Sequence, residues 1–191
     1  MHTAELCWLN EEDYLQGELT SQLRHEYVAG QIFAMVGASK VHNLISANLL
    51  VLLRAHLRQS PCRVFMMDMK VHITRKSAYY YPDIIVTCDP HDIRLDKNPY
   101  FVRAPCLIIE VLSPATAGID QREKLLAYQT LASLQEYVIV NQAGQQITVY
   151  RRTDSHWVVE NLVPDDILRL SSIGLNVTFA ELYEQTDVPT R

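Results

Sequence analysis

Glycine and proline are scarce in this sequence, with 6 and 8 residues among 191. This scarcity excludes collagen-like chains and the proline- and glycine-rich compositions of disordered proteins. Hydrophobic residues make up 48% of the sequence, a share typical of ordinary globular proteins. A chain of this length can bury a sizeable core and suits one domain. We therefore expect residues 1–191 to form a single domain.

Long apolar runs are also missing. The first residues, MHTAELCWLNEEDYLQGEL, have no basic start followed by an apolar stretch. No later segment approaches the roughly 20 apolar residues that are needed to span a bilayer. We therefore expect a cytoplasmic protein with no membrane partner.

The four cysteines, Cys7, Cys62, Cys88 and Cys106, lie far apart and form no CxxC pair. Their spacing to histidines is not that of a zinc site. Two of them fall in apolar strands, where a cysteine behaves as a small hydrophobic residue. The sequence therefore predicts neither a disulfide nor structural zinc.

Several catalytic and cofactor motifs are absent as well. No GxxxxGK[ST] loop or GxGxxG turn is present, so we expect no nucleotide cofactor. Ser113 does not lie in a GxSxG elbow, and no cysteine and histidine stand out as a pair. Hydrolysis through a covalent nucleophile therefore has little support.

Positive charge is in deficit overall, because the formal net charge is -5. The field of the whole molecule therefore does not attract nucleic acid, although a local basic surface or bound cations would offset it. Candidates for such a surface are Arg54, Arg58, Arg63, Arg75 and Lys76. The alternative is that these residues form an ordinary solvated surface.

The first third of the chain reads as a helix, a hairpin and a second helix. Residues 11–24 suggest a short N-terminal helix. The segment RHEYVAGQIFAM has β-prone runs on either side of Ala29 and Gly30, which predicts a hairpin with Glu26 on its first strand. From 40 to 57, apolar residues recur at three- and four-residue steps, which predicts an amphipathic helix.

The rest of the chain alternates strands and helices. We expect strands at 63–74, 79–88, 106–112 and 136–141, a loop at 91–103 and a helix at 117–132. Two further segments, 146–152 and 156–162, suggest an added antiparallel pair. Thr178 and Glu181 form a capping-box pattern for a last short helix.

This order predicts a mixed α/β fold. The long helix between the third and fourth strands favours a mixed sheet with helices on both faces. The core would span about 40–141, with an N-terminal helix and hairpin at 11–36 and a C-terminal extension at 146–191. The central sheet would place Asp83 and Glu110 on adjacent strands.

Glu110 is the most unusual residue of this core, because it lies within the apolar run CLIIEVL. A buried carboxylate without partners costs several kcal/mol or loses its charge. Asp83 would bring a second carboxylate close to it, and a divalent cation bound to both relieves their repulsion. Such a site favours Mg²⁺ or Mn²⁺, which can polarise a phosphodiester and lower the pKa of a bound water.

The segments YPDIIV and IIEVLSP, the helix with REKLLAY and the strand EYVIV resemble the PD-(D/E)XK nuclease superfamily. More narrowly, they resemble its Uma-type, restriction-endonuclease-like family. The resemblance covers about 24–151. It implies a restriction-endonuclease-like core and a metal-dependent endonuclease that acts on DNA. Nuclease folds of this kind often cut two strands as dimers, so a homodimer is expected.

The resemblance also assigns residues. Asp83 and Glu110 match the metal-binding acidic positions of the motif. The motif lysine is expected two residues after the glutamate, where this sequence has Leu112, and Lys124 in the following helix is its substitute. Glu26 matches the acidic position of the N-terminal hairpin. Further candidates for the cleft are His42, Asp68 and Tyr128.

Helical geometry supports Lys124 independently, because it projects on the side of its helix that carries packing residues. Structural alternatives remain for each residue. Asp83 would only shape a strand entrance after a proline, Glu110 would pair with a buried arginine, and Lys124 would be solvated. On those alternatives the chain is a catalytically inactive module that keeps the nuclease fold for dimerisation or partner binding.

Overall fold

The computed structural model describes residues 8–35, 37–96, 99–112 and 119–190. A six-stranded mixed sheet forms its centre, in the order β11-β10-β9-β8-β6-β3. Its strands are β3 (Arg63–Met66), β6 (Ile84–Thr87), β8 (Pro105–Leu112), β9 (Glu136–Asn141), β10 (Ile147–Arg152) and β11 (Trp157–Leu162). Among the described residues of this sheet, only β8 and β9 pair in parallel, and the helix α3 (Ile119–Tyr128) lies between them in the chain.

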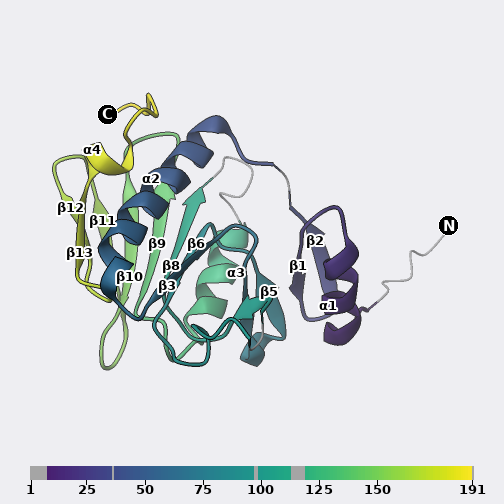
Figure 1. The fold of residues 1–191 in the computed structure, drawn as a ribbon. Coiled ribbons are helices and arrows are strands. Elements are labelled where there is room, and N and C mark those ends of the chain that lie inside the picture. The colour runs from purple at the N-terminus through teal and green to yellow at the C-terminus, as the bar shows by residue number, and fades with distance from the viewer. Residues whose placement is uncertain (1–7, 36, 97–98, 113–118, 191) are drawn as a thin grey trace.

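Helices cover both faces of this sheet. The helix α2 (Lys40–His56) lies across one face, as Figure 1 shows, and its buried leucines pack on Ile84 and Val86. Ile85 points the other way, into a second cluster that includes α3. The alternation of side chains along a strand therefore splits the apolar run after Asp83 between two layers. The expected mixed sheet with helices on both faces is confirmed.

A second sheet of five short strands runs in the order β2-β1-β5-β4-β7. Its strands are β1 (His25–Val28), β2 (Gln31–Ala34), β4 (Lys70–Ile73), β5 (Ala78–Tyr80) and β7 (Phe101–Val102). The helix α1 (Glu11–Thr20) lies beside β1 and β2, on the side of the molecule away from α4 (Figure 1). The expected N-terminal helix and hairpin are therefore present.

The C-terminal region forms a hairpin, β12 (Ile167–Leu170) with β13 (Leu175–Thr178), followed by α4 (Phe179–Leu182). Thr178 and Glu181 cap α4 with the reciprocal bonds of a capping box, as predicted. The hairpin was not predicted, and neither was β7 inside the expected loop. Two 3-10 turns complete the elements, η1 (Leu57–Gln59) and η2 (Thr74–Lys76).

The prediction of one strand from 63 to 74 was wrong. The chain breaks at Met67, whose φ is 41°, and passes from the six-stranded to the five-stranded sheet. Lys70 and His72, which alternate with apolar residues in the sequence, are buried in β4. The strand expected from 79 to 88 is also divided, because Pro82 has no N–H to donate where the chain leaves β5 for β6.

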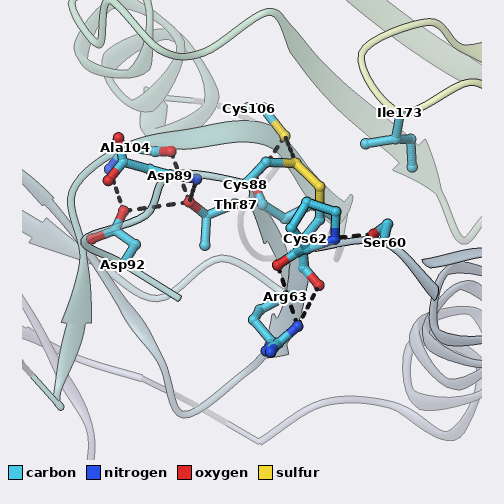
Figure 2. The surroundings of a disulfide bond; sticks show 12 residues. Ser60, Cys62, Arg63, Thr87, Cys88, Asp89, Asp92, Ala104, Cys106 and Ile173 are labelled. Carbon is cyan, nitrogen blue, oxygen red and sulfur yellow. Dashed lines mark hydrogen bonds between the residues drawn. A yellow bond between two sulfur atoms is a disulfide. The ribbon is translucent and has the colours of Figure 1, made fainter. Parts of the chain in front are cut away.

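The prediction that the chain has no disulfide was also wrong. Cys62 and Cys88 are joined by a disulfide (Figure 2). Arg63 and Thr87 are the end pair of the β3–β6 ladder, and Cys62 precedes Arg63 while Cys88 follows Thr87. The antiparallel register therefore brings together two cysteines that are 26 residues apart. The Sγ atom of Cys106 lies 3.8 Å from that of Cys88. Disulfides are uncommon in cytoplasmic proteins, so the cytoplasmic location stays a prediction.

None of the helices within the described residues is both long and apolar enough to cross a membrane.

Candidate active site

One cleft brings together most of the predicted site residues. It has a volume of about 420 Å³ and lies where the β1–β2 hairpin, the start of α2, the β3–β4 turn, β8 and α3 converge. Its lining includes Glu26, His42, Asp68, Asp83, Glu110 and Lys124. Of the predicted residues, only Tyr128 lies beneath the cleft, where it is fully buried.

Asp83 lies immediately before β6, in the chain bend that follows Pro82. The antiparallel register pairs Ile84 with Ile109, so Asp83 comes opposite Glu110 on the neighbouring strand. Its Oδ2 atom accepts a hydrogen bond of 2.7 Å from the backbone N–H of Val111. Sheet pairing therefore fixes the first carboxylate beside the second.

Glu110 lies inside β8, two residues before its end, and faces the α3 side of the sheet. Its Oε1 accepts from the Tyr128 hydroxyl at 3.1 Å and lies 3.4 Å from Lys124 Nζ. Burial raises the pKa of Glu110 to about 7, and the charges of Asp83 and Glu26 add to the effect while Lys124 opposes it. Its partner is therefore a lysine and not the arginine that the structural alternative required.

Lys124 projects from α3 between two carboxylates. Its Nζ lies 2.7 Å from Glu26 Oε1 and 3.4 Å from Glu110 Oε1. Burial opposes its charge, but the two carboxylates prevail and raise the pKa of Lys124 above its ordinary value. With its side chain only 16% exposed, Lys124 is not the solvated surface lysine of the alternative interpretation.

Glu26 comes from β1, in the other sheet. Its Oε1 binds Lys124 and also accepts a hydrogen bond of 3.2 Å from the backbone N–H of Tyr81. The N-terminal hairpin therefore contributes a third carboxylate, and this carboxylate connects the two sheets through Lys124.

His42 occupies the first turn of α2, which Ser39 caps by accepting from the His42 backbone N–H at 3.0 Å. Its Nε2 lies 3.2 Å from Asp83 Oδ2. Burial by itself would lower the pKa of His42, but the hydrogen bond and charge of Asp83 outweigh burial and raise it. The Nδ1 atom is buried with no hydrogen-bond partner among the described residues.

Asp68 and Tyr128 have different surroundings from these five residues. The Asp68 side chain is 81% exposed at the mouth of the cleft, where it lies 3.4 Å from Arg24. Tyr128 supports Glu110 from below through its hydroxyl.

Sequence reasoning missed the apolar part of the cleft lining. Leu23, Phe33, Met35 and Met67 all line it. A signal for Phe33 was present, because a hairpin centred on Ala29 and Gly30 pairs Phe33 with Glu26. No comparable signal marks Met67, which reaches the cleft through its left-handed backbone.

The chemistry of the acidic pair suits a hard divalent cation. Among the described residues, every hydrogen bond or ion pair of the two side chains uses Asp83 Oδ2 or Glu110 Oε1. Within that part of the chain, Asp83 Oδ1 and Glu110 Oε2 have no such partner. Within the described part of the chain, no three histidine, cysteine or carboxylate side chains form a metal site. Two carboxylates supplemented by waters are a ligand set typical of Mg²⁺.

Three of the five candidate basic residues gather elsewhere. Arg54, Arg58 and Arg63 line a groove of about 680 Å³ at the C-terminal end of α2. Because Arg54 lies 12 residues after His42 in α2, the helical rise places this groove about 18 Å from the cleft. The local basic surface therefore does not form part of the acidic cleft.

Comparison with known proteins places the chain among nuclease-like proteins. The model of the Uma2 family, described as "Putative restriction endonuclease", matches residues 11–180. Two proteins of Synechocystis sp., "Uncharacterized protein slr1290" and "Uncharacterized protein sll1609", are 39% and 31% identical. The matches cover 92% of this chain and 91% of the first relative, and 83% and 89% for the second.

A solved structure has the same fold. It is the crystal structure of "a putative nuclease belonging to DUF820" from Anabaena variabilis, with a TM-score of 0.74 at 18% identity. The match covers 92% of this chain and 97% of that one. The restriction-endonuclease-like architecture is therefore shared across nearly the whole chain.

Proposed function

The chain belongs to the Uma2 family of restriction-endonuclease-like proteins, and from this premise we propose that it is a nuclease that hydrolyses DNA phosphodiester bonds with a divalent metal ion. The observation that carries the proposal is the convergence of Asp83 and Glu110 from adjacent strands, with Lys124 Nζ 3.4 Å from Glu110. An acidic pair with a nearby ammonium group in a cleft suits phosphoryl transfer, which needs a cation and a charge stabiliser.

Asp83 and Glu110 would hold Mg²⁺ or Mn²⁺ through Asp83 Oδ1 and Glu110 Oε2, which make no hydrogen bond or ion pair with the described residues. When bound, the ion would supply a Lewis acid for a phosphoryl oxygen and would lower the pKa of a coordinated water. Ionised Glu110 is needed for this role. Its raised pKa therefore suits a group that gains its charge when the cation arrives.

The other residues have positioning and charge-stabilising roles. Lys124 presents an ammonium group at the floor of the cleft, where it would stabilise negative charge on the scissile phosphate. Glu26 holds this ammonium at 2.7 Å. His42 and the Val111 N–H fix Asp83, and Tyr128 fixes Glu110.

The test is cleavage of plasmid and single-stranded DNA with Mg²⁺, with Mn²⁺ and with EDTA. We expect cutting in either metal, none in EDTA, and at least a hundredfold loss in Asp83→Asn and Glu110→Gln. Asp154→Asn, an exposed carboxylate in the β10–β11 turn, is the matched control and should cut normally. Absence of cutting by the folded wild-type protein, together with no metal binding in calorimetry, would reject the proposal.

A non-catalytic module is the second candidate. The observation that favours it is that Lys124 already bridges two carboxylates, so its charge is balanced without substrate. Such a protein would keep the cleft fold in Asp83→Asn and Glu110→Gln but would show no metal-dependent cutting in any form.

Homodimer formation is part of the proposal, because nucleases of this fold often act as dimers. The strand β11 lies at the edge of the six-stranded sheet, and Val158 and Val159 on it are exposed. An edge strand with exposed apolar residues can pair with another chain. Light scattering should give twice the monomer mass, and Val159→Lys should lower it, whereas a wild-type monomer would end this part of the proposal.

A further inference from the structure

The cleft has two chemically different parts. Its lining contains the charged groups, here called the charged floor, and the apolar side chains of Leu23, Phe33, Met35 and Met67, here called the apolar wall. The side chains of Leu23 and Phe33 are 59% and 51% exposed, and Met67 is half-buried. Exposed apolar residues that gather at a cleft mark binding surfaces, because isolated ones are the norm on a protein surface.

The hairpin register turns Phe33 toward the charged floor. Phe33 pairs with Glu26 across the β1–β2 ladder, so both side chains lie on one face of the hairpin. Glu26 on that face reaches Lys124 at 2.7 Å. An aromatic ring therefore stands beside the carboxylates and the ammonium group.

The neighbouring residue Ile32 faces the other way. It pairs with Tyr27, which is buried against Tyr14 and Tyr79 on the far face of the hairpin. Ile32 is 49% exposed, nearly as much as Phe33, but it does not line the cleft. The two residues differ in orientation and not in exposure.

Met67 completes the apolar wall at a conformational cost. Its φ of 41° lies in the left-handed region, which is strained for a residue with a side chain. Its backbone N–H donates to the carbonyl oxygen of Asp83 at 3.2 Å. This contact places the thioether side chain next to the strand that carries the first carboxylate.

We propose that this cleft binds an unpaired nucleotide, with its base stacked on Phe33 and its phosphate at the charged floor. The inference rests on the proposed nuclease function and names its substrate class. A duplex presents phosphates outward and keeps its base faces stacked inside, so an apolar wall gains nothing from it. An unpaired base offers a π-face to an aromatic side chain whatever its sequence. The volume of about 420 Å³ is in the range of small-molecule sites.

The experiment measures binding apart from cleavage. Fluorescence anisotropy of the full chain, in EDTA and separately in Ca²⁺, compares a labelled oligothymidine strand, an oligouridine strand and a DNA duplex of equal length. We expect either single strand to bind more tightly than the duplex, and the two single strands distinguish DNA from RNA. Equal or tighter binding of the duplex, or no binding of any strand, overturns the proposal.

The variants test the wall itself. Loss of one stacked base corresponds to about 1–3 kcal/mol, so Phe33→Ala should weaken single-strand binding by about 5- to 150-fold. Ile32→Ala is the matched control and should change it less than twofold. Phe33→Trp should retain binding, and its fluorescence should be quenched by the oligonucleotide, which separates stacking from loss of folding.

Two results would contradict the assignment of the wall. If Ile32→Ala and Phe33→Ala weaken single-strand binding equally, the hairpin acts only through folding. A change of oligomeric mass in Phe33→Ala without a change in binding would make the wall a contact between copies of the chain. If the wild type cuts no DNA but binds single strands through Phe33, the nuclease proposal fails while the nucleotide site stands.

Discussion

Lys124 Nζ and Glu26 Oε1 lie 2.7 Å apart and join α3, which packs on the six-stranded sheet, to the first strand of the five-stranded sheet. Glu110 lies 3.4 Å from the same ammonium group. The ion pairs therefore serve both the floor of the cleft and the contact between two sheets. This double role means that substitutions at the cleft affect folding stability as well as activity.

Lys124→Met should destabilise the protein strongly at pH 8. It leaves two largely buried carboxylates without their cation, and breaking a buried ion pair typically costs about 3–5 kcal/mol. Urea unfolding measures the loss. Arg122→Met, on the exposed side of the same helix, is the matched control and should change the free energy of unfolding by less than about 0.5 kcal/mol. Equal stability of Lys124→Met and wild type would show that the carboxylates are compensated in another way.

Glu110 should make the metal-free protein less stable as the pH rises. Its pKa is raised from 4.5 in the unfolded chain to about 7 in the folded protein, so the folded state holds the proton more tightly. The free energy of unfolding therefore decreases as the pH rises from 4.5 to about 7. The total decrease is about 3 kcal/mol, at 1.36 kcal/mol per pKa unit. The raised pKa of His42 acts in the same direction at higher pH.

The comparison of wild type with Glu110→Gln isolates this effect. Unfolding by urea at pH 5 and at pH 8 should show a steeper loss of stability in the wild type, because glutamine does not titrate. Parallel pH profiles of the two proteins would mean that Glu110 ionises at an ordinary pKa.

Binding of Mg²⁺ or Mn²⁺ should release a proton at pH 6, since a cation needs Glu110 ionised while its raised pKa keeps it largely protonated there. Calorimetry in buffers of different ionisation enthalpy counts the protons released. The apparent affinity should increase up to about pH 7 and then level off. Metal binding that is as tight at pH 5 as at pH 8 would place the ion away from Glu110.

Reduction of the disulfide should lower the stability of the chain. Cys62 and Cys88 close a loop with a sequence separation of 26, for which the chain-entropy relation gives about 3.5 kcal/mol. Urea unfolding with and without dithiothreitol measures the difference, and Cys62→Ser/Cys88→Ser should match the reduced protein. Cys106→Ala controls for the loss of a thiol in the same cluster. A free energy of unfolding that does not respond to reductant would contradict a disulfide in solution.

Much of the cleft could be predicted from the sequence because its signals are local. The apolar run that surrounds Glu110, the hairpin turn after Glu26 and the helical spacing around Lys124 each fix a side chain relative to its own element. Adjacent strands then bring Asp83 opposite Glu110. The carboxylate of Glu110 nevertheless faces α3 from inside its strand, whereas the periodicity of the run by itself does not say which layer it meets.

Local sequence patterns do not predict the breaks in the strands expected at 63–74 and 79–88. Alternation of apolar and polar residues from 63 to 74 fits a single strand, yet the left-handed Met67 sends the second half into another sheet. The alternation of apolar and polar residues is the same whether or not the chain changes sheet, because each half of the segment is a strand with a period of two. Each half finds its hydrogen-bonding partners far away in the chain, β6 for β3 and β7 for β4, which the local pattern does not reveal.

The sequence by itself determined most element types, the mixed α/β core and the approach of Asp83 to Glu110, because periodicity, turn residues and caps act over a few positions. Tertiary structure alone decided the contacts that no local pattern indicates. It joined Cys62 to Cys88, placed Lys124 between two carboxylates from different sheets and lined one side of the cleft with apolar residues. These contacts depend on strand register and on the packing of one sheet against another, which couple residues far apart in the chain.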